Sequence, residues 1–375
     1  MINKKRLIRL TQALIRIDSQ NPGADESAIA HFVKNYLRRL GVKVRLVAFK
    51  KNRPNVIAVL EGINTKRSLL ITPHLDTVPQ GKNWRFPPMG AKIYQGKIYG
   101  LGATDCKGNA ACALEAINSL VEDKVILGYN LILAATADEE CGSGLGLAPL
   151  LEKGILKPDA CLVLDSDDFK LIVSQKGLLH LKVEIQGMRA HGAYPWRGIN
   201  AIGLAINILK EIEAIKLKFT ANRYLKRPTV NIGTIRGGDK VNIVADWCEF
   251  ELDFRFLPGM TEKPFLRKLR NIIRKYTPSF KIEIEGVQKP YAIAKSHILV
   301  SQIARAMREL KITPRISGSE GATTITFFQD KFIPALATGF GSGGCAHTAD
   351  EYVKIGNLCK GAKVLENFLK NFKFN

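Results

Sequence analysis

Apolar residues in the first half of the chain recur at spacings typical of alternating helices and strands. Between residues 24 and 40 they return every three or four positions, which predicts an amphipathic helix that stops at Gly41. A second helix is predicted at 109–121, and strand-like runs are found at 43–48, 55–60, 68–72, 130–136 and 160–164. The last three runs are continuously apolar, which is typical of central strands covered on both faces. This pattern predicts an α/β domain whose mostly parallel central sheet is flanked by helices.

The pattern changes near residue 177, where apolar and polar residues begin to alternate. The elements predicted beyond this point are a strand at 178–185, a helix at 201–215, strands at 229–235 and 247–255, a helix at 262–276 and a strand at 281–285. This is the order of a ferredoxin-like α+β domain, which we place at residues 177–288. A helix at 297–310 and an apolar strand at 333–338 then resume the α/β pattern. The smaller domain is therefore predicted to be inserted into a discontinuous domain formed by residues 1–176 and 289–375.

The composition is that of a folded protein without a membrane-spanning helix. The 375 residues are 46% hydrophobic and 24% charged, close to ordinary globular usage, which argues against disorder or a coiled coil. Apolar runs fall short of the roughly 20 residues that cross a bilayer, so we expect no membrane partner. Residues 1–10 alternate charged and apolar positions, which predicts an exposed first helix rather than a signal peptide. Seven cysteines without a Cys-x-x-Cys pair predict reduced thiols and a cytoplasmic location.

The strong positive charge raises the question of an acidic partner. There are 56 Lys and Arg residues against 34 Asp and Glu, and the formal net charge is +22. Such a field attracts nucleic acid, anionic lipid and acidic metabolites alike. The basic segment 263–275 has the spacing of an ordinary amphipathic helix with a basic exposed face, and no RNA- or DNA-binding motif accompanies it. We therefore expect no nucleic-acid partner, and a non-catalytic protein that binds metal or nucleic acid is the remote alternative.

The first candidate for chemistry lies where the buried strand at 68–72 ends, at His74-Leu75-Asp76. The two-residue spacing directs the His74 and Asp76 side chains to the same side of an extended chain. A carboxylate beside an imidazole orients the ring and raises its basicity, as a metal-binding histidine requires. Taken alone, the pair more often marks a strand-end histidine followed by a turn aspartate.

Four further clusters contain residue types that bind metal ions. They are residues 99–108 with Asp105, residues 134–142 with Asp138, Glu139 and Glu140, residues 162–165 with Asp165, and residues 343–351 with His347. Singly, each has a simpler explanation, such as a helix N-cap or a solvated acidic loop. Four of the five clusters, however, follow a predicted core strand, and ligands bind at that edge of open α/β sheets. Together they predict a site for zinc or a similar divalent ion, with the thiolates of Cys106, Cys141 and Cys345 as less favoured ligands.

The ordered motifs resemble those of one enzyme family. They are His74-Leu75-Asp76, the segment 100–108 around Asp105, Asp138-Glu139-Glu140, Asp165, and His347-Thr348-Ala349-Asp350-Glu351. Together they resemble the family of acetylornithine deacetylase, succinyl-diaminopimelate desuccinylase and carboxypeptidase G, over nearly the whole chain. The resemblance implies a zinc-dependent metallopeptidase or amidohydrolase with two zinc ions per subunit, for which cobalt or manganese can substitute.

The resemblance also implies a role for each site residue. The metal ligands it implies are Asp105 as a bridge between the two ions, His74 and Asp165 in one site, and Glu140 and His347 in the other. Asp76 would support the first histidine, and Glu139 would remain free as the general base that takes a proton from water and returns it to the leaving amine. In relatives the peptide bond after the bridging aspartate is cis, so we expect the Asp105-Cys106 bond to be cis.

Three residues of the inserted domain share the resemblance. His191, in Arg189-Ala190-His191-Gly192, matches a histidine that reaches the active site of a partner subunit and helps to bind the oxyanion. This match implies a homodimer formed through residues 177–288; without it, a turn histidine that caps a helix would explain His191. Asn242 and Arg255 match positions that contact a substrate carboxylate, a task that suits a guanidinium group.

The resemblance leaves the substrate class open. Thr324-Ile325-Thr326 stands where many relatives carry Asp-Ala-Arg, so the polar contacts of that segment are reduced. Relatives with Glu at the position of Asp165 are mostly deacylases and carboxypeptidases, whereas Asp is more usual in aminopeptidases and dipeptidases. We predict hydrolysis of the amide bond of a small N-acyl amino acid, with a dipeptidase, aminopeptidase or carboxypeptidase of the same family as the alternative.

Overall fold

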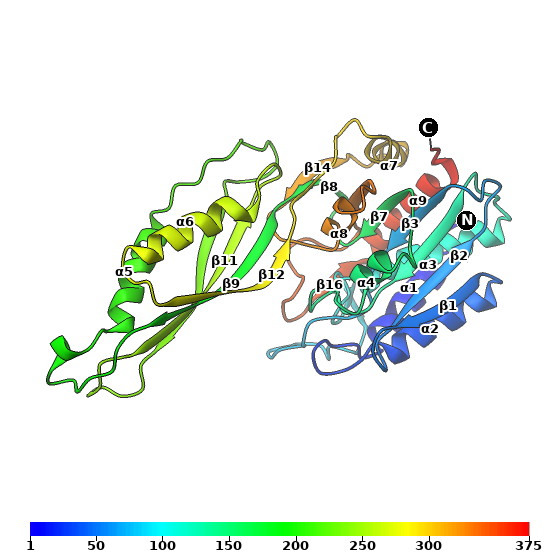
Figure 1. The fold of residues 1–375 in the computed structure, drawn as a ribbon. Helices are drawn as coiled ribbons and strands as arrows, with labels where there is room; N and C mark the ends of the chain where they lie inside the picture. The colour runs from blue at the N-terminus through cyan, green and yellow to red at the C-terminus, as the bar shows by residue number, and fades with distance from the viewer. Residues whose placement is uncertain (375) are drawn as a thin grey trace. The chain divides into compact units, whose positions relative to one another are not determined.

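The computed structural model describes residues 1–374 and divides into two compact units (Figure 1). Unit 1 comprises Met1–Val173, Ile293–Ser317 and the chain from Thr323 onwards, and unit 2 comprises Ser174–Ala292 and Gly318–Ala322. The sequence pattern does not predict that residues 318–322 belong to the second unit. Among the described residues, no helix has both the length and the apolar character needed to span a membrane.

A nine-stranded sheet, most of whose strands belong to unit 1, has the order β1-β2-β6-β3-β7-β15-β8-β13, with β14 paired to β8; β13 and the ends of β8 and β14 belong to unit 2. Its strands are β1 (Lys43–Ala48), β2 (Pro54–Leu60), β3 (Ser68–Thr72), β6 (Asn130–Ala135), β7 (Ala160–Leu164), β8 (Lys170–Gln175), β13 (Tyr291–Ala292), β14 (Arg315–Ser319) and β15 (Ala335–Thr338). The four neighbours β6, β3, β7 and β15 are parallel, whereas β1, β2, β8 and β13 pair in antiparallel fashion. The predicted α/β class with a mainly parallel central sheet is therefore confirmed.

The helices of unit 1 are α1 (Lys4–Ile15), α2 (Ser27–Arg39), α3 (Lys107–Glu122), α4 (Leu147–Glu152), α7 (Ile298–Glu309), α8 (Thr326–Gln329) and α9 (Ile355–Asn371). Helix α3 is buried along almost its whole length and packs against α1 and α9. The prediction that the first helix is exposed is wrong, because its charged residues occupy one face while Leu7, Leu14 and Ile15 are fully buried on the other. Helix α9 has no counterpart among the predicted elements.

A small second sheet in unit 1 joins two segments that are far apart in the sequence. Strand β5 (Lys97–Tyr99) pairs with β4 (Lys92–Tyr94) on one side and with β16 (Tyr352–Lys354) on the other. Tyr352 lies opposite Tyr99 in this pairing. The loop that ends at Glu351 therefore lies next to the turn that begins at Gly100. Strands of three residues are too short for a hydrophobic pattern to predict.

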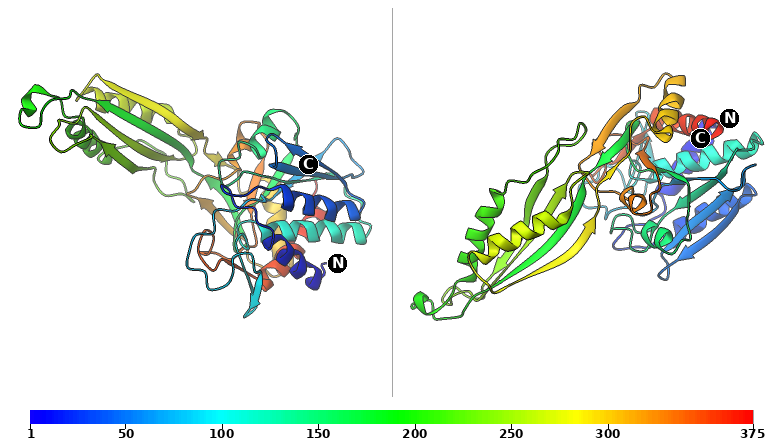
Figure 2. Two further views of the ribbon diagram at one scale, coloured as in Figure 1. Left: turned by 90° about the horizontal axis from the view of Figure 1, so that it is seen from below. Right: turned by 45° about the horizontal axis from the view of Figure 1, so that its top comes forward.

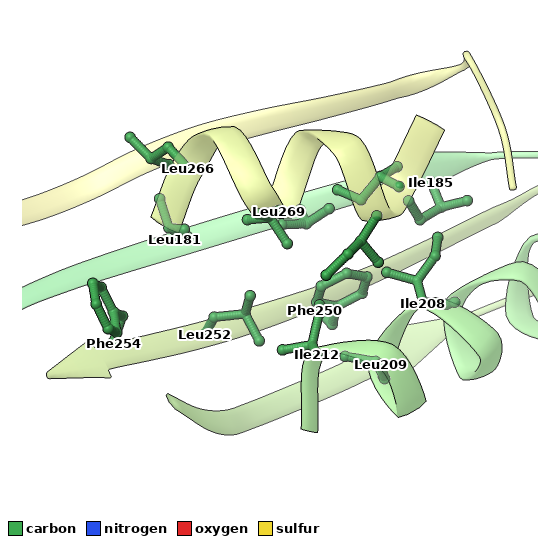
Figure 3. Packing of buried hydrophobic residues seen from close by; sticks show 14 of the residues in the cluster. Leu181, Ile185, Ile208, Leu209, Ile212, Phe250, Leu252, Phe254, Leu266 and Leu269 are labelled. Atoms are coloured by element: carbon green, nitrogen blue, oxygen red, sulfur yellow. The ribbon is translucent and has the colours of Figure 1, made fainter. Parts of the chain in front are cut away.

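Unit 2 consists of a strand, a helix, two strands, a helix and a strand (Figures 1 and 2). These elements are β9 (Gly177–Gln186), α5 (Ala201–Glu213), β10 (Thr229–Gly237), β11 (Trp247–Phe256), α6 (Glu262–Arg274) and β12 (Phe280–Gln288). The strands form an antiparallel sheet in the order β10-β11-β9-β12. Figure 3 shows Leu181, Phe250 and Leu269 in the core between this sheet and the helices α5 and α6. The element order is the ferredoxin-like order, while a lid or dimerisation role for this unit stays a prediction.

Candidate metal centre

The carboxyl ends of the parallel strands bring most of the candidate residues together. His74 and Asp76 follow β3, Glu139 and Glu140 follow β6, and Asp165 follows β7 directly. An isolated bridge between His74 and Thr136 keeps the two loops after β3 and β6 side by side. Parallel neighbours end at the same edge of a sheet, and this edge is where open α/β folds bind ligands.

One group of possible metal ligands consists of His74, Asp105 and Asp165, whose ligand atoms all lie within 4.8 Å of one another. The His74 Nε2 atom lies 2.9 Å from Asp105 Oδ1. The His74 side chain is only 2% exposed, and its Nδ1 lies 3.0 Å from the Asp76 backbone oxygen and 3.5 Å from Asp76 Oδ1. Asp76 therefore fixes the Nδ1 side of the ring, and Nε2 remains directed at the carboxylates of this group.

A second group consists of Asp105, Glu140 and His347, again with ligand atoms within 4.8 Å of one another. The His347 Nε2 atom lies 3.3 Å from Asp105 Oδ2 and 3.3 Å from Glu140 Oε1. Asp105 thus presents one carboxylate oxygen to each histidine, which is the arrangement of a bridging ligand. The Glu140 Oε1 atom is buried, and apart from this contact with His347 it has no hydrogen-bond partner among residues 1–374, as expected of an oxygen kept for a metal ion.

The donor set and its electrostatics fit a pair of divalent cations. Two imidazoles and several carboxylates are nitrogen and oxygen ligands of the type that zinc accepts. Burial raises the pKa of Asp165 to about 7, and the negative charge of Asp105 adds to this effect. Burial also favours a raised pKa for Asp105. The contacts of Asp105 with His347 and His74 outweigh the effect of burial, and the pKa of Asp105 is lowered. Buried carboxylates so close together repel one another unless cations neutralise them.

Glu139 lies beside these two groups without belonging to either. Burial raises the pKa of Glu139 well above its ordinary value, and the neighbouring Asp165 charge raises it further. The backbone N–H groups of Glu139 and Glu140 donate to the two oxygens of Asp76, each at 3.1 Å. Asp76 is completely buried and so fixes the two glutamates as well as the imidazole of His74. The sequence pattern indicates the contact of Asp76 with His74. It does not indicate the contacts of Asp76 with the two glutamates.

A buried polar network behind this loop was not predicted from the sequence. The Asn21 side chain donates to Asp76 Oδ2 at 3.0 Å and to Asp138 Oδ1 at 3.1 Å. The Arg53 guanidinium pairs with Glu26 and also donates to Asp138 Oδ1 at 3.1 Å. Glu26 is fully buried, so its pairing with Arg53 offsets the cost of burying the charge. Hydrophobic periodicity contains no signal for such contacts, because they join residues more than 20 positions apart.

The cysteines near the centre contact backbone oxygens. The Cys106 thiol donates to the Leu164 oxygen at 2.8 Å, and the Cys345 thiol donates to the Ser342 oxygen at 3.0 Å. Cys141 is exposed, and none of the three belongs to a metal-binding group among the described residues. The structure therefore gives no support to thiolate ligands. The Asp105-Cys106 peptide bond is cis, as the resemblance implied.

The candidate residues of unit 2 do not all lie together. His191 and Asn242 lie on adjoining loops, because the Gly192 N–H donates to the Asn242 backbone oxygen at 2.8 Å. Both side chains belong to exposed residues, and His191 Nδ1 accepts the Ala193 N–H at 3.0 Å. Arg255 lies towards the other end of β11 and pairs with Asp253, its Nε lying 2.8 Å from Asp253 Oδ1.

The strand register separates these residues within one chain. Trp247 at the start of β11 lies opposite Gln186 in β9, whereas Arg255 lies opposite Leu178 near the start of β9. Eight residues of extended chain span roughly 27 Å. Asn242 precedes Trp247, so a single unit 2 does not bring Asn242 and Arg255 to one small ligand.

The segment that departs from the family pattern is buried. Thr324 is 5% exposed, Ile325 is completely buried, and Thr326 starts the short helix α8 at 2% exposure. Its side chains therefore contribute to packing in unit 1. An arginine at position 326 would have to displace its neighbours. Because Thr326 stands there instead, this segment has no cationic side chain at this point of the fold.

These features define a class, that of dinuclear metal-binding peptidases and amidohydrolases. Residues 70–371 match the model of Peptidase family M20/M25/M40, and the chain belongs to this family. The chain is accordingly an enzyme, a metallopeptidase or amidohydrolase, as the sequence motifs implied.

Curated relatives match over almost their full length. Acetylornithine deacetylase from Edwardsiella ictaluri is 30% identical over 390 residues, which cover 97% of each chain. The acetylornithine deacetylase of Proteus mirabilis is 28% identical over 385 residues, covering 98% of this chain and 95% of the relative. Succinyl-diaminopimelate desuccinylase from Orientia tsutsugamushi is 27% identical over 384 residues, covering 98% and 97%.

Solved structures share the fold at lower identity. Aminopeptidase PepT from Bacillus cereus aligns with a TM-score of 0.82 and 23% identity over 98% of each chain. An M20 family metallo-carboxypeptidase from Sulfolobus solfataricus aligns with a TM-score of 0.81 and 21% identity over 98% of this chain and 99% of its own. At this level of identity the likeness establishes the fold and leaves the substrate open.

Proposed function

We propose that this enzyme is a zinc-dependent amidohydrolase that removes the acyl group from a small N-acyl amino acid. The observation that carries the proposal is the position of Glu139. Asp76 holds the backbone of both Glu139 and Glu140, yet only Glu140 belongs to a group of possible metal ligands. Two adjacent carboxylates are thereby assigned different tasks, one as a ligand and one as a proton carrier.

The proposed reaction is hydrolysis of an amide, in which the oxygen of water bonds to the carbonyl carbon and the carbon–nitrogen bond breaks. The two groups that share Asp105 would hold two zinc ions, which would polarise the carbonyl and acidify a water molecule. Glu139 accepts the proton from water and returns it to the leaving nitrogen. Burial raises the pKa of Glu139 above its ordinary value, which strengthens it as a proton acceptor and favours its holding the proton until the leaving nitrogen takes it. Asp76 keeps His74 and the Glu139 backbone in place throughout.

The relatives favour an acyl amino acid as the substrate. The curated sequence relatives at 27–30% identity are named as a deacetylase of acetylornithine and a desuccinylase of succinyl-diaminopimelate. Asn242 and Arg255 remain our candidates for binding the substrate carboxylate. The missing Asp-Ala-Arg segment removes a cation that would bind a second carboxylate, so we favour acyl groups without a charge. Short dipeptides come second because Asp165 stands where aminopeptidases and dipeptidases usually carry Asp.

Parallel assays of N-acetyl amino acids, N-succinyl-diaminopimelate and neutral dipeptides test this choice. We expect the highest kcat/KM for N-acetyl amino acids that carry a free carboxylate next to the scissile amide. Capping that carboxylate as an ester or amide should cost about 1.5–3 kcal/mol, the range for hydrogen bonds to charged groups. A kcat/KM that is highest for the succinylated compound would show that the missing segment does not exclude a second carboxylate. Dipeptides as the best substrates would establish the alternative peptidase activity.

We propose a homodimer formed through unit 2, in which residues of both subunits would contact one substrate. Roughly 27 Å of strand separates the end of β11 that carries Arg255 from the end near Asn242, which is longer than an acyl amino acid. His191 lies on the loop next to Asn242, so both would come from the partner subunit. We therefore propose that His191 binds the oxyanion of the partner's substrate.

Mixed dimers test this arrangement. A His191→Ala subunit combined with a Glu139→Gln subunit should form one site in which both residues are intact. Purified heterodimers should then recover about half of the wild-type activity per dimer, although each parent homodimer is inactive. Pairing two His191→Ala subunits with different affinity tags provides the control for the purification. Heterodimers as inactive as their parents would place His191 and Glu139 in the same subunit's site, and an active His191→Ala homodimer would place His191 outside the site.

The remaining expectations concern location and other partners. The cysteines of the described chain are all unpaired, which supports the predicted cytoplasmic location. The basic segment forms α6, which buries Phe265 and Leu269 in the core of unit 2 and exposes its charges. This packing supports the interpretation of the segment as a structural helix. A non-catalytic role in binding nucleic acid stays the remote alternative.

A further inference from the structure

Glu351 is a buried carboxylate that contacts the turn preceding Asp105. Only 1% of this residue is exposed. Its Oε2 accepts the backbone N–H of Gly102 at 2.9 Å, and its Oε1 accepts those of Thr104 at 2.7 Å and Asp105 at 2.9 Å. An ionised carboxylate suits this position because it only accepts hydrogen bonds, whereas an amide would direct an N–H group at a donor.

Glu351 also ends the loop that carries His347. The loop is attached to Thr104 at both of its ends. The Ser342 N–H donates to Thr104 Oγ1 at 2.9 Å, and the same hydroxyl donates to the Tyr352 backbone oxygen at 2.7 Å. The turn that carries Asp105 and the loop that carries His347 are therefore joined through one carboxylate and one hydroxyl.

The two groups of possible metal ligands depend unequally on this junction. Asp105, whose N–H Glu351 accepts, belongs to both groups. In the first group, however, His74 is held by Asp76 and Asp165 follows strand β7, so neither lies on the loop that Glu351 ends. In the second group, His347 is supplied by the loop that Glu351 ends, and its side chain is 53% exposed. Loss of the junction should therefore disturb the second group more than the first.

We propose that Glu351 is a positioning residue that sets the placement of His347 relative to Asp105 and so controls binding of the second metal ion. This inference rests on the metal centre of the proposed function and assigns it a residue that does not touch the ions. Glu351 acts through the backbone of the turn at 102–105 rather than through contact with substrate.

Titration of metal-free protein with Zn²⁺ in a calorimeter, repeated with Co²⁺ and read by visible absorption, separates the two binding events. In Glu351→Gln we expect the dissociation constant of the second ion to rise about 10–100-fold, the range for residues that orient metal ligands, and that of the first to change less than about threefold. The absorption assigned to the second Co²⁺ should weaken accordingly, while that of the first persists.

Glu115 provides a matched control. It is also a fully buried glutamate that accepts a backbone N–H, from Asn3 at 2.6 Å, and it pairs with Arg6 at 2.7 Å. It lies on α3 outside both groups, so Glu115→Gln should perturb stability without selective loss of one ion. Thr104→Val removes the hydroxyl of the same junction and should also weaken binding of the second ion selectively. Thr104→Ser keeps a hydroxyl and should bind the second ion with wild-type affinity. These two variants decide the question if Glu351→Gln does not fold.

The outcomes are distinct. Selective weakening of the second ion in Glu351→Gln or Thr104→Val supports the proposal. Unchanged binding of both ions, equal weakening of both, or the same selective loss in Glu115→Gln would overturn it. A wild-type protein that binds no second ion would instead contradict the metal centre of the proposed function.

Discussion

Replacing Glu139 with glutamine should lower kcat by about 10²–10⁴-fold while the protein keeps its metal ions. The amide has nearly the same size and still permits the Glu139 backbone N–H to donate to Asp76. It cannot accept a proton from water, so only the transfer step is lost. Because Glu139 lies outside both groups of possible ligands, metal content should stay at the wild-type value. Steady-state kinetics and elemental analysis of the same preparation measure both quantities.

Two further variants define what the Glu139 result means. Glu140→Gln changes the adjacent carboxylate, which lies 3.3 Å from His347, and should reduce metal content as well as turnover. Glu152→Gln removes an exposed carboxylate at the end of α4 and should leave both unchanged. Normal turnover in Glu139→Gln would require another residue to carry the proton. Loss of metal in the same variant would make Glu139 a ligand rather than a base.

Much of the fold could be predicted because local patterns determine it. Strands β1, β3 and β7 begin and end at the predicted residues, since each is a run of apolar or alternating residues between clear breaks. The ferredoxin-like order of unit 2 followed from strict alternation in β9 and β11. Strands β4, β5 and β16 escaped prediction because three residues do not form a pattern. The pairing of β16 with β5 also depends on contacts between residues about 250 positions apart.

The sequence predicts the possible metal ligands of the candidate site but not the residues that hold those ligands in place. His74, Asp105 and Asp165 each have a simpler structural explanation when taken alone, and only their occurrence together in one ordered set of motifs indicates metal binding. Their convergence followed from the parallel sheet. Arg53, by contrast, lies in no motif, and Glu351 ends the His347 motif without any role that the sequence indicates; only the folded chain brings them beside Asp138 and the turn at 102–105. The resemblance also implied Asn242 and Arg255 as contacts of one substrate carboxylate, whereas strand register separates them within one chain.

Removal of the metal ions should abolish hydrolysis, and added Zn²⁺ or Co²⁺ should restore it. In the proposed mechanism the chain supplies a base and positioning groups, but among the described residues no cationic side chain belongs to either group of possible ligands except the two imidazoles. Polarisation of the carbonyl therefore depends on the bound ions. Dialysis against a chelator, elemental analysis and assay before and after metal addition measure the effect, and about two ions per subunit should accompany full recovery. Full activity in protein verified to be free of metal would contradict the proposed mechanism.

Asp105 is the residue whose loss should reproduce metal removal most closely. One of its oxygens lies 2.9 Å from His74 and the other 3.3 Å from His347, so Asp105→Ala takes a ligand from both sites at once. Variants of His74 or His347 should each weaken one site, because each belongs to one group. Asp123→Ala, at a carboxylate on the surface that pairs with the N-terminus, controls for the loss of a negative charge. If Asp105→Ala bound two ions with wild-type affinity, the shared carboxylate would not be the bridge between them, and the two groups would have to act as separate sites.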